Sequence, residues 1–219
     1  MQGSRTLGRF CQRVLSHVYQ FLYQLDNQLP IQARAIVLRE LPNLKRALKL
    51  ALEAGALDEA VTFAECINRF LNNFGRWRER DEVASLVEKA VNSDQPALSG
   101  ANGAIEGSSL GSRKITKREF LLESGRGERL LQQGRAGEAE QIFRALLSRL
   151  EGEAEYDTRR YDQTTTMQWL GRCLRAQGRP SQAADFYRRA IALAEGLEQD
   201  KDNKNELASC HGDLAGVLV

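Results

Sequence analysis

Apolar residues recur every three or four positions along most of the chain, and polar residues separate them. The first such stretch, residues 6–27, places Phe10, Val14, Val18 and Phe21 on one side of a helix. This spacing predicts amphipathic helices that bury one face. Runs of β-branched residues are missing, so we expect no strand.

Glycine and proline divide this pattern into segments. Gly55 and Gly75 follow apolar stretches as helix ends, and Gly134 and Gly178 mark tight turns. Pro180, just after the last of these, suits the first turn of a helix. Further helices are therefore expected over residues 31–54 (with a kink or break at Pro42), 58–74, 76–92, 114–133, 136–151, 156–177, 181–197 and 203–219.

Residues 93–112 differ from the rest because glycine, serine, asparagine and proline dominate and few large apolar residues remain. Such a segment cannot offset its ordering entropy by burial, so we interpret it as a flexible linker. It lacks the GxxxxGK[ST] pattern of a phosphate-binding loop. The predicted organisation is a helical segment over 1–92, the linker, and a helical array over 113–219.

A fixed period runs through the array. Gly127, Gly171 and Ala215 lie 44 positions apart (171 − 127 = 44; 215 − 171 = 44). The same step relates Leu130 to Leu174 to Leu218, Gly134 to Gly178, Ala139 to Ala183, and Phe143 to Tyr187. A period of this size indicates stacked supersecondary units that share one continuous core. The predicted fold is all-α: antiparallel helix pairs stacked as an α-solenoid.

Composition argues against several functional classes. The formal net charge is +2, without the excess of basic residues typical of a dedicated nucleic-acid binder. Four widely spaced cysteines form no CxxC motif, which favours a reducing compartment and a cytoplasmic protein. No apolar run is long enough for a signal peptide or a membrane span.

Candidate chemistry is sparse. The chain has 2 histidines; one lies six positions after Cys11 and the other adjoins Cys210, and neither has further ligands nearby in sequence. No nucleophile, base and oxyanion-hole arrangement can be recognised. We therefore expect no catalytic residue, no cofactor and no metal, and we read the cysteines as small buried hydrophobes.

Residues 164–195 resemble a tetratricopeptide repeat (TPR). The residues that carry the resemblance are Leu170, Gly171, Leu174, Gly178, Ala183, Tyr187 and Ala190. The preceding unit departs from the family pattern at Arg126 and Leu146. The usual TPR period is about 34 residues, so these units resemble the longer repeats of kinesin light chains and bacterial signalling ATPases. The resemblance implies a right-handed superhelix whose first helices line a concave binding face.

A second resemblance concerns the helical segment over residues 1–92, which we call the front segment. Asn43-Leu44, Ala47-Leu48 and Gly75-Arg76 are similar to the helical region that follows the ATPase core in bacterial STAND-class regulators. In this register Asn68 takes the place of Gly127, which makes the linker an insertion in a continuing array. The resemblance implies an interaction or sensor segment of a larger signalling protein.

The TPR resemblance also implies which side chains line the concave face: Glu65, Arg69, Asn72, Ser124, Glu128, Leu131, Gln168, Arg172 and Arg175. The Lys/Asn clamp of chaperone-binding members is not matched, since Ser124 and Glu128 stand in its place. Arg69, Arg172 and Arg175 would attract an acidic peptide. The alternative is that these arginines are solvated or paired within the array.

The sequence thus predicts a non-catalytic scaffold that binds a protein or peptide. Self-association through the apolar residues of 207–219 is an alternative, because an array that stops within a helix pair exposes an uncovered end. Nucleic-acid binding through the arginine groups at 76–80 and 113–118 is the third and weakest hypothesis. We also expect the chain to be a piece of a longer protein.

Overall fold

The computed structural model describes residues 22, 25–26, 28–94, 114–152, 158–197 and 201–218. Most of the predicted helix 6–27 and residues 95–112 of the predicted linker lie outside them. The chain divides into two compact units, Met1–Ala104 and Ile105–Val219. Each unit is described by itself.

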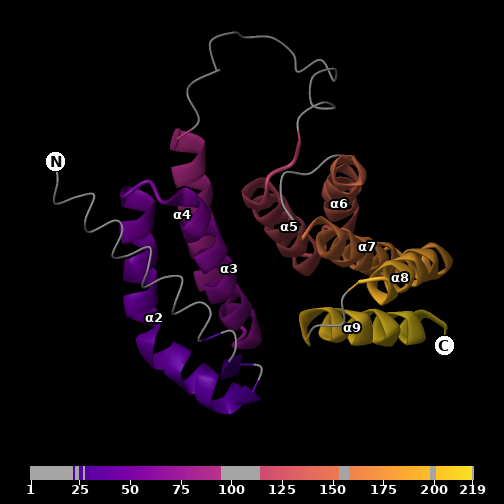
Figure 1. The fold of residues 1–219 in the computed structure, drawn as a ribbon, viewed down its shortest axis with the longest axis horizontal. Helices are drawn as coiled ribbons and strands as arrows, with labels where there is room; N and C mark the ends of the chain where they lie inside the picture. Colours follow the sequence, from indigo (N-terminus) through magenta and orange to yellow (C-terminus); the bar gives the residue numbers. More distant parts are fainter. Residues whose placement is uncertain are drawn as a thin grey trace, which may run out of the picture. The chain divides into compact units, whose positions relative to one another are not determined.

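Among its described residues, the first unit has the helices α2 (Pro30–Glu53), α3 (Leu57–Asn73) and α4 (Trp77–Asp94). α3 packs against both of the others, and α2 also touches α4 (Figure 1). The buried side chains come from the predicted apolar stripes; Leu48, Phe63, Phe70 and Leu71 are almost fully buried. Residues 93 and 94, which were assigned to the linker, belong to α4.

Pro42 does not end its helix. α2 runs through it, and the ribbon bends partway along its length (Figure 1). A proline inside a helix has no N–H to donate to the carbonyl four residues earlier, here Leu38. Because packing contacts hold the helix before and after the proline, the helix bends at this point and does not end. Buried Leu41 and Leu44 supply such contacts close to Pro42.

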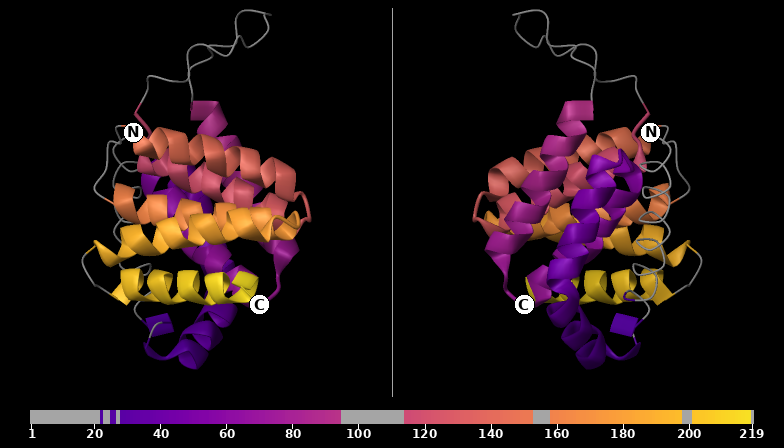
Figure 2. Two further views of the ribbon diagram at one scale, coloured as in Figure 1. Left: turned by 90° about the vertical axis from the view of Figure 1, so that its right-hand side faces the viewer. Right: turned by 90° about the vertical axis from the view of Figure 1, so that its left-hand side faces the viewer.

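The part of the second unit that the structure describes forms the helices α5 (Lys117–Gln132), α6 (Ala136–Glu151), α7 (Arg159–Ala176), α8 (Pro180–Glu195) and α9 (Lys201–Leu218). Each packs against the next, and α7 also touches α5 and α9 (Figure 2). The described helices form sequential antiparallel pairs in a TPR-like arrangement, which confirms the predicted fold class. Within this unit α5, α7 and α9 are the first helices of successive pairs.

Four helix ends share one backbone motif. Gly55, Gly75, Gly134 and Gly178 have φ between 67° and 79°, in the left-handed region that favours glycine. After α5, Gly134 N–H donates to the Leu131 carbonyl at 3.0 Å, and the next N–H donates to the Leu130 carbonyl at 2.9 Å. This pair of bonds is the Schellman motif, and the other three turns repeat it. The predicted glycine turns are confirmed.

The small residues of the repeat lie where helices cross. A Cβ built on Gly171 would lie 2.3 Å from Tyr187 Cε1, and one on Gly127 would lie 2.7 Å from the Phe143 ring. Both aromatic rings are fully buried. In both units of the repeat, a glycine thus admits a bulky aromatic side chain from the next helix. Ala215, the third member of the series, is exposed.

Candidate functional site

The predicted groove residues of α7 meet two polar residues of α9. Gln168 Nε2 donates to Ser209 Oγ at 2.7 Å and to Asp213 Oδ2 at 3.0 Å. Arg172 Nε donates to Asp213 Oδ2 at 2.7 Å, and its Nη2 donates to Ser209 Oγ at 3.2 Å. We call Gln168, Arg172, Arg175, Ser209 and Asp213 the α7–α9 polar cluster.

Arg175 completes this cluster from the next turn of α7. Its Nη1 lies 3.7 Å from Asp213 Oδ1, so one carboxylate faces both arginines. Their side chains remain 27% exposed at Arg172 and 45% exposed at Arg175, while Asp213 is 13% exposed. The Arg172 guanidinium also lies 4.6 Å from the centroid of the Trp169 ring. The two guanidinium groups thus form the solvent side of the cluster, above the largely buried Asp213, and Glu206 interacts electrostatically with Arg172 from the same helix as Asp213.

The predicted groove positions on α5 are Ser124, Glu128 and Leu131, and all three are buried or half-buried. Ser124 is buried, and Glu128 is half-buried. Leu131 is half-buried and packs against the core of the second unit. None of these three positions holds an arginine.

In the first unit, the three predicted positions lie on α3. Arg69 Nη2 contacts Asp26 Oδ2 at 3.3 Å, and Asn72 Oδ1 accepts a 2.9 Å hydrogen bond from Arg80 Nη1. Glu65 is half-buried. The three arginines singled out from the sequence are therefore each paired with an acid of their own unit, which was one of the two alternatives left open.

Sequence reasoning missed Ser209 and Asp213. A signal was present, since they lie 44 positions after Thr165 and Trp169 (209 − 165 = 44; 213 − 169 = 44). Their spacing of four residues also places them on one helix face. Continuing the repeat register into α9 would have placed them opposite Gln168 and Arg172.

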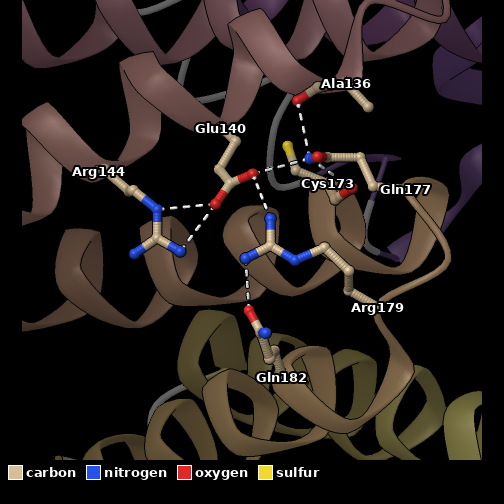
Figure 3. Close-up of polar contacts among 7 residues, drawn as sticks. All are labelled: Ala136, Glu140, Arg144, Cys173, Gln177, Arg179 and Gln182. Atoms are coloured by element: carbon tan, nitrogen blue, oxygen red, sulfur yellow. Dashed lines mark hydrogen bonds and ion pairs between the residues drawn. The ribbon is translucent and has the colours of Figure 1, made fainter.

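A second polar group, also missed, joins α6 to the following hairpin (Figure 3). Glu140 accepts hydrogen bonds from Arg144 Nε at 2.8 Å, Gln177 Nε2 at 2.8 Å and Arg179 Nη1 at 2.9 Å. Burial raises the pKa of the Glu140 carboxyl, but the bonds from Gln177 and Arg144 outweigh it and the net pKa is lowered. This group connects two successive helix pairs and is a structural contact.

Two properties of the described residues concern metal binding and membrane insertion. Among the residues that the structure describes, no group of three or more His, Cys, Asp or Glu side chains could hold a metal ion. Within the same residues, no helix combines the length and the hydropathy that crossing a membrane requires.

Paired helices, glycine turns and glycine–aromatic crossings together favour one repeat family. Residues 119–196 match the tetratricopeptide repeat model. This match covers most of α5 and the whole of α6, α7 and α8. TPRs generally mediate protein–protein interactions. No catalytic family is assigned to the chain.

The TPR fold also has a counterpart among solved structures. The chain is similar to the crystal structure of BtubC (BKLC) from P. vanneervenii, with a TM-score of 0.54 and 14% sequence identity. The similarity covers 96% of this chain and 82% of that one. At this identity the likeness concerns the fold alone. No curated protein matches the chain.

Proposed function

We propose that the chain is a non-catalytic scaffold that binds an acidic protein segment along the first helices of its second unit. The observation that carries the proposal is the α7–α9 polar cluster, where Arg172 and Arg175 hold one carboxylate between them. An arrangement that accepts the carboxylate of Asp213 has the geometry to accept the carboxylate of a bound peptide.

Aromatic surface lies beside these charges. Trp169 is half-buried, stacks on Phe143 with ring centroids 6.0 Å apart, and carries the Arg172 guanidinium on its ring. Partly exposed tryptophan and arginine are the residue types that most often dominate binding energy at protein interfaces. The proposed site therefore offers an apolar contact next to two cations.

Binding can be tested by isothermal titration of the whole chain with an acetylated, amidated oligoglutamate peptide, with oligoglutamine as the neutral control. We expect the acidic peptide to bind and the neutral one to fail. The double variant R172A/R175A should lose about tenfold or more in affinity, because each charge-assisted hydrogen bond contributes about 1.5–3 kcal/mol.

The matched control is the double variant R188A/R189A on α8, which removes two exposed arginines whose partners are Asp185 and Glu151. It changes the net charge by two units, as R172A/R175A does, without touching the α7–α9 polar cluster. Equal losses in the two double variants would show that only net charge matters, and equal binding of the two peptides would contradict the proposal.

Self-association is the second candidate, and one observation favours it. On α7, residues Thr164, Met167, Gly171 and Leu174 are buried. The residues 44 positions later on α9 are Ala208, His211, Ala215 and Leu218, and all four are exposed. A second copy could cover this face. A chain that sediments as a monomer at high concentration would exclude this candidate, and Leu218→Glu should dissociate a dimer if one forms.

The wider role rests on the sequence resemblance of the front segment. We propose that the chain is the interaction part of a larger bacterial regulator of the STAND class, acting in the cytoplasm. Three free, buried cysteines (Cys66, Cys173 and Cys210) suit a reducing compartment. The reading frame on both sides of this segment tests the idea directly: an adjoining ATPase supports it, and unrelated neighbours contradict it.

A further inference from the structure

We propose that Asp213 is an internal ligand that occupies the carboxylate position of the binding site and lowers its affinity for acidic partners. The inference rests on the proposed function, and it adds a regulatory element to that site. It predicts that the side chain of Asp213 and a peptide carboxylate compete for the same two arginines.

The geometry of the contact supports competition. Asp213 uses Oδ2 for Arg172 Nε at 2.7 Å and Oδ1 for the longer contact to Arg175 Nη1 at 3.7 Å. This is the arrangement in which a glutamate or aspartate of a partner would bridge the two guanidinium groups. The arginines keep solvent-exposed surface, so an incoming carboxylate can reach them without unfolding α7.

The α9 residues beside Asp213 leave the arginines accessible. Gly212 and Gly216 carry no side chain, and a Cβ built on Gly216 would lie 3.4 Å from Arg175 Nη1. No side chain at position 216 therefore separates Arg175 from an incoming carboxylate.

The equivalent position one repeat earlier lacks this acid. Trp169 stands 44 positions before Asp213, and Glu128 stands 44 positions before Arg172 (213 − 169 = 44; 172 − 128 = 44). Between α5 and α7 the pattern therefore places no carboxylate opposite an arginine. The acid that does cross the α5–α7 contact, Asp162, lies at another position and pairs with Lys117 at 2.6 Å, so the acid between two arginines belongs to the α7–α9 contact.

The test measures the affinity of the oligoglutamate peptide for the wild-type chain, Asp213→Asn and Asp185→Asn. Both variants remove one negative charge, but Asp185 is an exposed acid on α8 that pairs with Arg188. Asp213→Asn keeps an oxygen that can accept from Gln168. We expect D213N to bind the peptide about tenfold more tightly than wild type, since charge-assisted bonds are the strong ones, and D185N to bind about as wild type does.

A second variant tests the opposite direction. Gly216→Asp adds a carboxylate close to Arg175 and should weaken peptide binding several-fold. It keeps the inference testable if D213N fails to fold, which circular dichroism will show.

Three results distinguish the two proposals. The internal ligand is supported if D213N binds the oligoglutamate peptide more tightly than wild type while D185N does not. It is also supported if D213N binds the peptide and wild type shows no binding. Measurable wild-type binding that D213N leaves unchanged or weakens overturns it and leaves the proposed function intact. No binding by wild type, D213N or D185N overturns the proposed function and the internal ligand together.

Discussion

Replacing Gly171 by alanine probes the stacking of helix pairs most sharply. The added Cβ would lie 2.3, 2.6 and 2.8 Å from three atoms of the Tyr187 ring. Ordinary carbon–carbon contacts are about 3.5–4 Å, so ring or helix must move by about 1 Å. Tyr187 is fully buried, and no exposed side of the ring can absorb that movement.

The magnitude follows from two opposing terms. Overpacking a close-packed site costs about 1–3 kcal/mol, whereas alanine gains up to about 1 kcal/mol over glycine in a helix interior. We expect G171A to destabilise the chain by about 1–2 kcal/mol, which lowers the melting temperature by about 2–8 °C for a chain of this size. Thermal unfolding followed by far-ultraviolet circular dichroism measures the shift.

Gly212→Ala is the matched control. Gly212 lies inside α9, and an added Cβ would meet nothing within 4 Å. Only the helix-propensity gain remains, so G212A should raise the melting temperature. In a Tyr187→Ala background the overlap is gone, and G171A should become neutral or stabilising. Equal shifts for G171A and G212A in the parent chain would refute the packing argument.

Two further predictions concern buried polar groups. The pKa of Glu140 is lowered below its ordinary 4.5, so its bonds stabilise the fold above that value and are lost as pH falls through the lowered pKa. Glu140→Gln should therefore cost about 1–2 kcal/mol at pH 7 and much less at pH 3, measured by urea unfolding; an equal cost at both would contradict this. Burial raises the pKa of Cys66, Cys173 and Cys210 to about 12. A thiol reagent at pH 8 should therefore modify at most one of the 4 cysteines, Cys11, until the chain is unfolded, and rapid labelling of more would contradict the buried core.

Helix positions could be predicted from the sequence because glycine marks the turns with little ambiguity. α6 has the predicted bounds, and the Gly134 and Gly178 turns are where the pattern placed them. The sequence pattern predicts a start at residue 114, whereas α5 begins three residues later, at Lys117. Thr116 and Glu119 form a capping box, with bonds of 3.2 and 3.0 Å, and this signal in the sequence defines the true start.

The candidate site was harder to predict because polar partners depend on register between helices. The resemblance to TPRs implied Gln168, Arg172 and Arg175 as groove positions on α7, and in the structure these side chains contact Ser209 and Asp213 of α9. It did not supply Asp213, since family patterns describe packing residues and are silent on side chains that vary from repeat to repeat. Whether the paired arginines bind a partner stays a prediction.

The fluorescence of Trp169 tests the central claim most directly. The chain has 2 tryptophans, so Trp77→Phe leaves Trp169, which lies under Arg172, as the single emitter. Titrating this variant with the oligoglutamate peptide should change its emission along a saturable curve that R172A/R175A abolishes. Peptide binding detected by calorimetry without any change in Trp169 emission would place the binding site elsewhere and contradict the account.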